Sequence, residues 1–464
     1  MTELFNPLDT EHYRELDNRH FVHPWEDLGD IRKNSRTVVT SGEGIYLIDS
    51  DGKKLIDGPG GMWCCQIGYG RKEMADAIAE QVMRIPYFSP FNLTSDVASV
   101  LSGKISELAP GDLDHVFFTT GGSTAVDTAF RFVSFRNNVL GRPEKKIIIS
   151  RHDAYHGSTY LAASASGKSR DKNFQDQATH LFAHLSSPKP LNRPPEQSID
   201  DFRDACIKEL EDKILELGAD KVAAFIAEPV LASGGVVVPP EGYHRMCLEV
   251  CRKYDVVYIS DEVVTGFGRM GHWFASEEVF DIEPDIITSA KGLTSGYLPL
   301  GACIVSDRLM RDLHRPDGSS ATFSNGFTYS AHPVSCAAAL KNIEIMEQEN
   351  ILQHVRDITP YFQERLQELT ELEIVKEVRG VGLMACVECQ LGQGGASLAD
   401  DYQMGSRIDK HCQQLGLIVR PLVNMCVMSP ALIITRQQID EMVNLLREGI
   451  VRATQDLKDE GLLD

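Results

Sequence analysis

The chain has 464 residues, of which 42% are hydrophobic and 24% charged, and its net charge is −21. This composition is that of a globular protein with a large core, and it excludes a disordered, collagen-like or coiled-coil main state. The excess of acidic residues opposes binding to nucleic acid and to anionic membrane surfaces. A small anionic substrate is still compatible with it, because an acidic protein can contain a local basic pocket.

The sequence predicts neither a membrane span nor a leader peptide. Residues 318–340 carry no Asp, Glu, Lys or Arg, but they are too rich in Ser, Thr, Asn, Gly and Pro for an apolar helix. The first seven residues lack a basic region followed by an apolar one. The 11 cysteines are scattered and odd in number, which indicates free thiols in a reducing compartment, so a cytoplasmic protein is expected.

Three kinds of pattern follow one another along the chain. Residues 44–57 alternate around Asp51-Gly52, as in a β-hairpin. From residue 342 the pattern is helical, then strand-like at 380–387, then helical again. Between these ends, short apolar runs alternate with helical patterns, and the runs are His115–Thr120, Lys146–Ser150, Val222–Ala227, Val256–Ser260 and Asp285–Ser289.

This alternation predicts an α/β protein with a mostly parallel sheet flanked by helices. We expect the sheet to form a large domain over residues 71–340. Residues 1–70 and 341–464 are expected to form a smaller α+β domain together. In open sheets of this kind, ligands bind at the carboxyl ends of the strands, so the residues after each run are the candidates for chemistry.

A Gly-rich turn, Gly121–Ala125, follows the first run and opens a helix. Such a turn presents free backbone N–H groups and the positive end of the helix dipole, which favours an anion such as phosphate. A tight turn capped by Ser123 or Thr124 is the alternative. The turn matches neither the dinucleotide Gly-x-Gly-x-x-Gly pattern nor a Walker A loop, and Gly167-Lys168-Ser169 lacks the upstream glycine of the latter.

The other runs are followed by Tyr155 and His156, by Glu228, by Asp261 and by Lys291. Taken singly, these residues could be metal ligands, helix caps, salt-bridge partners or solvated loop residues. A desolvated lysine, however, loses its proton readily and becomes a nucleophile toward carbonyls. Together with a phosphate-binding turn, a carboxylate and an aromatic face, it provides what pyridoxal 5'-phosphate requires.

The chain resembles the class III aminotransferases, which are pyridoxal-phosphate enzymes of fold type I. Within this class it is most similar to the omega-aminotransferases, which use amines or omega-amino acids with pyruvate. The resemblance extends from about residue 14 to residue 450. The segments that carry it are Ile259–Arg269 (ISDEVVTGFGR), Asp285–Leu298 (DIITSAKGLTSGYL), Asp57–Gly70, Thr119–Arg131, Tyr155–Thr159 and Phe323–Pro333.

The resemblance implies a role for each matching residue. Lys291 is the Schiff-base lysine and proton carrier, and Asp261 is the partner of the pyridine nitrogen. Tyr155 and Val263 lie on the two faces of the ring, and Thr328 binds the phosphate of the partner subunit, which implies a homodimer. The cofactor-binding set is Gly122, Ser123, Tyr155, His156, Glu228, Asp261, Val263, Lys291 and Thr328.

The resemblance also implies a substrate pocket. Its aromatic walls are Trp25, Trp63, Tyr155 and, from the partner subunit, the equivalent of Phe91. Arg420 matches a mobile arginine that pairs with a substrate carboxylate and turns away for uncharged amines. The alternatives are core packing for Trp63 and a surface salt bridge for Arg420.

Four positions depart from the wider class. Val264 stands where many members have Gln, and Asn325 where many omega-aminotransferases have His. Thr124 replaces a frequent Glu. Ser233 stands where ornithine- and GABA-type members have Glu, which disfavours those two activities.

The expected function is transfer of an amino group from an amine donor to an oxo acid, most simply pyruvate, by a ping-pong mechanism. An aminomutase or decarboxylase of the same class is the alternative, and a nucleotide-dependent dehydrogenase or a binding protein without turnover is a more distant one. No metal site is expected, because Cys386 and Cys389 face opposite sides of a predicted strand. The physiological amine, a pairing of dimers into tetramers and the role of Cys64 and Cys65 stay open.

Overall fold

The computed structural model describes residues 9–29, 36–314, 321–391 and 398–463. Its α-helices are α1 (Thr10–His20), α2 (Gly60–Trp63), α3 (Lys72–Arg84), α4 (Asp96–Leu108), α5 (Gly122–Val139), α6 (Tyr160–Ala165), α7 (Ile199–Leu217), α8 (Tyr243–Lys253), α9 (Ser276–Phe280), α10 (Asp307–Arg311), α11 (Pro333–Gln348), α12 (Ile351–Gln367), α13 (Leu398–Leu415) and α14 (Arg436–Asp459). Its 3-10 helices are η1 (Ser169–Lys172), η2 (Pro190–Asn192), η3 (Lys291–Leu293) and η4 (Glu368–Glu371).

The strands are β1 (Val39–Glu43), β2 (Tyr46–Asp49), β3 (Lys54–Asp57), β4 (His115–Thr119), β5 (Ile147–Arg151), β6 (Phe182–Leu185), β7 (Val222–Ala227), β8 (Val257–Asp261), β9 (Ile286–Ser289), β10 (Gly301–Val305), β11 (Val375–Val381), β12 (Met384–Cys389), β13 (Leu417–Ile418), β14 (Arg420–Leu422) and β15 (Met425–Met428). They form three sheets, the largest of which has seven strands. All five strands predicted for the middle of the chain lie in that sheet.

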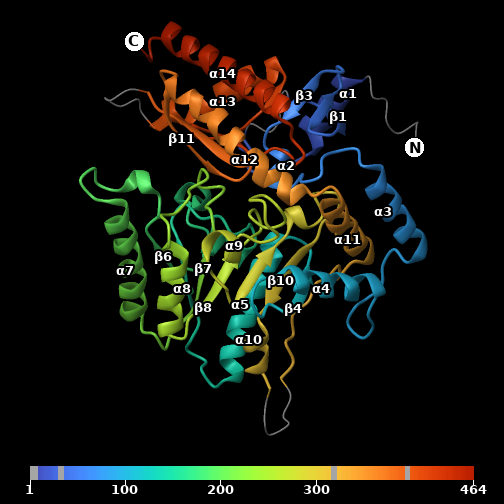
Figure 1. Ribbon diagram of the computed structural model, residues 1–464, viewed down its shortest axis with the longest axis vertical. Coiled ribbons are helices and arrows are strands. Elements are labelled where there is room, and N and C mark those ends of the chain that lie inside the picture. The colour runs from blue at the N-terminus through green and yellow to red at the C-terminus, as the bar shows by residue number, and fades with distance from the viewer. Residues whose placement is uncertain (1–8, 30–35, 315–320, 392–397, 464) are drawn as a thin grey trace.

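The seven-stranded sheet has the order β4-β10-β9-β8-β7-β5-β6. Strands β5 to β9 run parallel to one another, whereas β10 is antiparallel to both β4 and β9. Helices cover both faces of the sheet (Figure 1): Ile226 packs in a cluster with α5 residues, and the preceding residue, Phe225, packs in a cluster with residues of α7 and α8. The prediction of a mostly parallel sheet flanked by helices is therefore confirmed.

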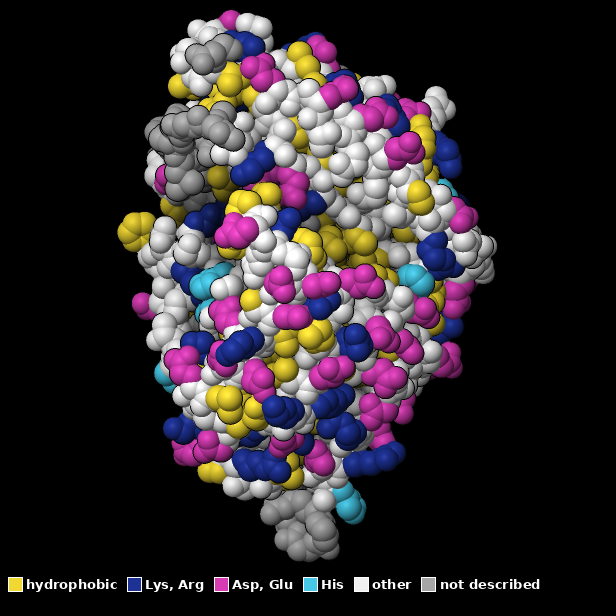
Figure 2. All heavy atoms as spheres, turned by 60° about the vertical axis from the view of Figure 1, so that its left-hand side comes forward, with side chains coloured by type: hydrophobic (Ala, Val, Ile, Leu, Met, Phe, Trp, Pro, Cys, Tyr) yellow, Lys and Arg dark blue, Asp and Glu magenta, His cyan; other side chains and the backbone are white. Residues whose placement is uncertain are grey.

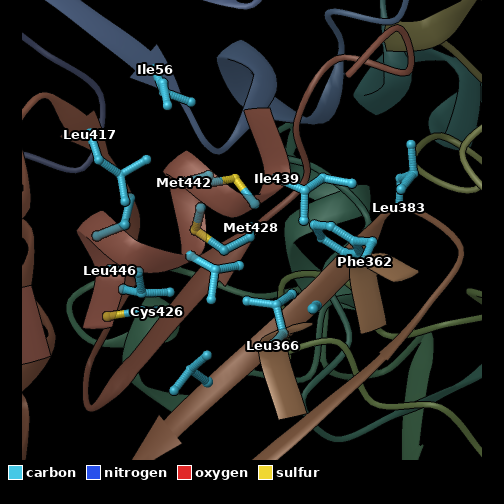
Figure 3. Close-up of a cluster of buried hydrophobic side chains, with 14 of the residues drawn as sticks. Ile56, Phe362, Leu366, Leu383, Leu417, Cys426, Met428, Ile439, Met442 and Leu446 are labelled. Atoms are coloured by element: carbon cyan, nitrogen blue, oxygen red, sulfur yellow. The ribbon is translucent and has the colours of Figure 1, made fainter. Parts of the chain in front are cut away.

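Both ends of the chain build the remaining α+β region. In one sheet, β3 from the start of the chain pairs in parallel with β13 near its end, and Ile56 lies opposite Leu417. Figure 3 shows Ile56 in the same apolar core as Phe362, Met428 and Met442, which come from α12, β15 and α14. The hairpin around Asp51-Gly52 is confirmed by the antiparallel pairing of β2 with β3.

The single strand expected at 380–387 is wrong. The segment crosses a hairpin, in which β11 pairs antiparallel with β12. Gly382 turns the chain with a φ of +58°, a left-handed conformation that glycine adopts without steric cost. Cys386 and Cys389 then both lie on β12 and pack into different clusters, so they do face opposite sides as expected.

The exterior carries charges of both signs. Figure 2 shows Lys and Arg side chains intermixed with Asp and Glu side chains over one face of the molecule. Among the described residues, no helix combines the length and the apolar character needed to cross a membrane.

Candidate active site

The carboxyl ends of β8 and β5 bring Asp261 and His156 together across 105 residues of sequence. Asp261 Oδ2 lies 2.7 Å from His156 Nδ1, and the two side chains are 3% and 0% exposed. Thr288, on the neighbouring strand β9, donates to Asp261 Oδ1 at 3.1 Å, and the Val263 backbone N–H donates to the same oxygen at 3.2 Å. Because donors from three segments hold it, the Asp261 carboxylate has a fixed orientation.

Glu228, directly after β7, holds the loop that carries Tyr155. Its carboxylate accepts the backbone N–H of Tyr155 at 2.9 Å and that of Ala232 at 3.1 Å. Burial raises the pKa of Glu228, and the nearby His156 opposes that rise. The side chain thus positions Tyr155 through its backbone.

Lys291 lies beside this carboxylate cluster, at the start of η3. Its φ is +44°, an uncommon left-handed conformation for a residue with a side chain, so the surrounding structure must impose it. Burial lowers the pKa of the Lys291 amine, whereas Asp261, Cys64 and Glu228 oppose that shift. The lowered pKa increases the share of the neutral, nucleophilic amine.

The first turn of α5 has the features of an anion-binding site. Gly121 occupies the N-cap position and provides no side-chain cap, which leaves the first backbone N–H groups available. A Cβ at Gly122 would lie 2.9 Å from the Val263 side chain. Glycine at this position therefore allows the start of α5 to pack against Val263, two residues after Asp261. Ser123 Oγ accepts the Ser158 N–H at 3.0 Å and joins this turn to the Tyr155 loop.

Arg420, at the start of β14, approaches the same region from the C-terminal part of the chain. Its Nη1 contacts the sulfur of Met62, and its buried Nε has no hydrogen-bond partner. Burial lowers the pKa of the guanidinium, and Tyr155 is the group that most favours its charged form. A thioether sulfur is a weak acceptor, so the Arg420 guanidinium is suited to pair with a carboxylate supplied by a ligand.

The remaining predicted residues differ in their surroundings. The Trp25 ring lies 5.8 Å from that of Tyr155 and is largely exposed, whereas Trp63 is only 2% exposed and packs in an apolar cluster. Phe91 is 68% exposed and lies against Gly326. Thr328 is exposed on the same loop as Gly326, and its carbonyl accepts a hydrogen bond from the Tyr87 hydroxyl at 2.7 Å.

The sequence model of the family described as "Aminotransferase class-III" matches residues 30–450. The chain is a class-III aminotransferase. It is 38% identical to the putrescine–pyruvate aminotransferase of Pseudomonas aeruginosa, over 95% of this chain and 96% of that protein. It is 39% identical to the diaminobutyrate–2-oxoglutarate transaminase of Halomonas elongata, over 92% of each.

Solved structures agree with this assignment. The thermostable (S)-enantioselective omega-transaminase of Thermomicrobium roseum matches the aminotransferase with a TM-score of 0.90 at 36% identity, covering 98% of this chain and 99% of that chain. The fold is therefore fold type I of the pyridoxal-phosphate enzymes, as predicted.

The cofactor of the aminotransferase is pyridoxal 5'-phosphate. The observed side chains fit it: the uncapped start of α5 suits a phosphate, the buried Asp261 suits a protonated ring nitrogen, and Lys291 provides a buried amine near Asp261. The observed cluster brings together the predicted Tyr155, His156, Glu228 and Val263. The individual role of every predicted residue stays a prediction.

Sequence reasoning missed two polar contributors to this region. Thr288 faces Asp261 from the neighbouring strand, and its only signal was a polar residue within the apolar run of β9. Lys168 lies beside Tyr155, with its Nζ 5.2 Å from the ring centroid, although its sequence context indicated only a failed Walker A loop.

Proposed function

We propose that this aminotransferase transfers the amino group of an amine or omega-amino acid to pyruvate by a ping-pong mechanism. The observation that carries the proposal is the placement of a lysine with a lowered pKa beside a buried, hydrogen-bonded carboxylate, near an arginine whose buried Nε has no hydrogen-bond partner. The first two groups suit amino-group chemistry. The arginine suits the carboxylate of an oxo acid.

Ser123 and Asp261 would bind the cofactor, and two further residues would orient Asp261. Ser123 and the N–H groups of the α5 start hold the phosphate, and Asp261 holds the proton on the ring nitrogen. His156 and Thr288 keep the Asp261 carboxylate aimed in one direction. Pyridoxal phosphate, when bound, supplies an electron sink for the carbon that bears the amino group.

Lys291 would then move the proton. In its neutral form, Nζ accepts the proton from the amine-bearing carbon of the donor, and it can return that proton to a neighbouring carbon. Asp261 and Glu228 stabilise the ammonium that forms, since both favour the charged state of Lys291. Alternation of donor and oxo acid at this one site requires the first product to leave before the second substrate binds.

The substrate pocket would lie between Tyr155 and Arg420. Arg420 pairs with the oxo-acid carboxylate, and the exposed ring of Trp25 lies near enough to Tyr155 to form part of a wall. We extend the proposal to Trp63 as a wall and to Phe91 and Thr328 as residues that complete the site of a partner subunit in a homodimer. The exposure of Phe91 and Thr328 on adjoining segments supports this extension.

The test is a donor and acceptor matrix with the cofactor-loaded protein. Putrescine, beta-alanine and 1-phenylethylamine are each combined with pyruvate or 2-oxoglutarate, and the amino-acid product is quantified. We expect alanine formation with pyruvate and parallel lines in double-reciprocal plots. Repeated turnover of the donor without any oxo acid, beyond the single equivalent of product that the first half-reaction releases, or release of carbon dioxide, would contradict the proposal and indicate an aminomutase or a decarboxylase. Glutamate formation alone would overturn pyruvate as the acceptor.

A further inference from the structure

Lys168 is a nearly buried lysine at the edge of the candidate substrate pocket. It precedes η1, and its side chain is 9% exposed. Nζ donates to Ser233 Oγ at 2.5 Å and lies 5.2 Å from the centroid of the Tyr155 ring. Ser233 is one of the four positions at which the sequence departs from the wider class.

The charge of Lys168 is incompletely compensated. Its nearest carboxylate is Asp171, 3.9 Å from Nζ, a distance at the outer limit of an ion pair. Ser233 is a neutral acceptor, and the face of Tyr155 offers a modest cation–π attraction. Burial lowers the pKa of Lys168 to about 8, so the amine still carries a proton at neutral pH. A buried cation with such weak partners is stabilised when an anion binds beside it.

Arg420 adds a second cation to the same pocket. Arg420 interacts electrostatically with both Lys168 and Tyr155. The positive charges of Arg420 and Arg170 both disfavour the protonated form of Lys168. The carboxylates that face these groups are Asp171 and Glu228, and the pKa of Glu228 is raised by burial. Around Lys168, three cations (Lys168, Arg170 and Arg420) therefore face two carboxylates, although the whole chain is strongly acidic.

We propose that Lys168, held by Ser233, is a specificity-determining residue that acts with Arg420 to select amine donors whose far end is anionic. This inference rests on the proposed transaminase function and narrows it. Omega-amino acids with a terminal carboxylate or sulfonate bring the missing negative charge to the two cations. A diamine brings a second ammonium to the same place and is repelled by them.

The experiment compares two donors that match in length and differ in the charge of the far end. The cofactor-loaded wild type, Lys168→Gln and Lys168→Met are assayed with 4-aminobutyrate and with putrescine, at a fixed pyruvate concentration. The uncharged 1-phenylethylamine serves as the reference donor. Lys172→Gln is the matched control. It removes one positive charge from the same segment of the chain, but Lys172 Nζ donates to the Ser164 carbonyl and not to Ser233.

Ser233 in place of Glu disfavours GABA-type activity within the wider class, but in this chain Ser233 holds a cation, Lys168. We therefore expect the wild type to favour 4-aminobutyrate over putrescine in kcat/KM. Loss of the Lys168 charge should lower kcat/KM for 4-aminobutyrate by about tenfold, chiefly through KM, as for a charge-assisted contact. The value for putrescine should rise, and that for 1-phenylethylamine should stay within about twofold. Lys172→Gln should leave the donor preference unchanged. An equal change for all three donors, or an unchanged ratio of 4-aminobutyrate to putrescine, would overturn the proposal.

A binding measurement separates this proposal from the proposed function. Butyrate has the anionic end of 4-aminobutyrate without its amine, so it binds without reacting. It should raise the melting temperature of the cofactor-loaded wild type, and the rise should be smaller in both Lys168 variants than in Lys172→Gln. If no donor turns over with pyruvate, the proposed function fails while this measurement still decides on Lys168. An equal rise in all four proteins would contradict the role of Lys168.

Discussion

The strand-end face of the large sheet and the core formed by the two chain ends are built in opposite ways. At the strand ends, Asp261, His156 and Lys291 are charged or polar groups in a largely buried setting, and hydrogen bonds fix the first two. In the other region, Phe362 and Met442 are completely buried among apolar side chains (Figure 3). Burying polar groups costs free energy, whereas burying apolar groups stabilises the fold, so the second region supports a fold in which the first is proposed to carry the chemistry.

This difference means that activity and stability should respond to different substitutions. A change at the strand ends should remove transamination while the protein stays folded. A change in the apolar core should lower stability while each folded molecule keeps its turnover. The four predictions below test this separation, from the largest expected effect to the smallest.

Lys291→Ala should have the largest effect. It removes both the proposed attachment point of the cofactor and the group proposed to move the proton, so kcat should fall by at least about 1,000-fold. The melting temperature should not fall, because the lost amine is a desolvated cation in a left-handed backbone conformation. Single-turnover assays check the loss of turnover, and thermal unfolding checks the melting temperature. A variant that keeps more than a tenth of wild-type turnover would contradict the role of Lys291.

Asp261→Asn should follow in size. The amide preserves shape, but it carries no charge to keep a proton on the ring nitrogen, so kcat should fall by about 100-fold or more. Thr288→Val, which removes one donor to the same carboxylate, should lower kcat by a smaller factor. Steady-state kinetics at saturating cofactor check the order. Equal kcat values for Asp261→Asn and the wild type would show that the carboxylate is structural.

Phe362→Ala should act on stability alone. The residue is completely buried in the core of Figure 3, and truncation of such a ring costs about 3–5 kcal/mol. Denaturant unfolding measures this loss, and activity per folded, cofactor-loaded molecule should match that of the wild type. Leu215→Ala is the control, since Leu215 is 56% exposed on α7 and its loss should cost less than about 0.5 kcal/mol. A drop in kcat without a drop in stability would break the separation.

Asp409 on α13 should reveal the smallest effect, a pH dependence of stability. Burial raises the pKa of its carboxyl from 3.8 to about 6. Because folding raises this pKa, the protonated carboxyl stabilises the folded state. This contribution is complete at pH values below the unfolded pKa of 3.8, and it is lost as the pH rises through about 6. Asp409→Asn should therefore raise stability by up to about 3 kcal/mol above pH 7, and the gain should vanish near pH 4. Chemical denaturation at both pH values is the measurement, and an equal effect at both would contradict the assignment.

Much of the fold could be predicted because local patterns determine it. Buried parallel strands such as β7 are continuous apolar runs, and the Asp51-Gly52 turn marks its hairpin. The strand β10 was missed because Gly301 begins it, directly after a Gly-rich loop. The turn at Gly382 was missed because apolar residues continue on both sides of it.

The site could be predicted only in part. Lys291, Asp261 and the α5 turn carry their own local motifs. The contacts of Thr288 with Asp261 and of Lys168 with Ser233 depend on the arrangement of strands and loops that are distant in sequence. No local pattern reports that a lysine 65 residues away donates to Ser233, so tertiary structure was needed to find it.

The most direct test of the central claim is to find which lysine carries the cofactor. The cofactor-loaded protein is reduced with borohydride and digested, and the modified peptide is identified by mass spectrometry. The structure offers two candidates of lowered pKa near Tyr155 and Asp261, namely Lys291 and Lys168. We expect the modification on Lys291 alone. Modification of Lys168, or of neither lysine, would contradict the assignment of the strand-end face as the catalytic centre.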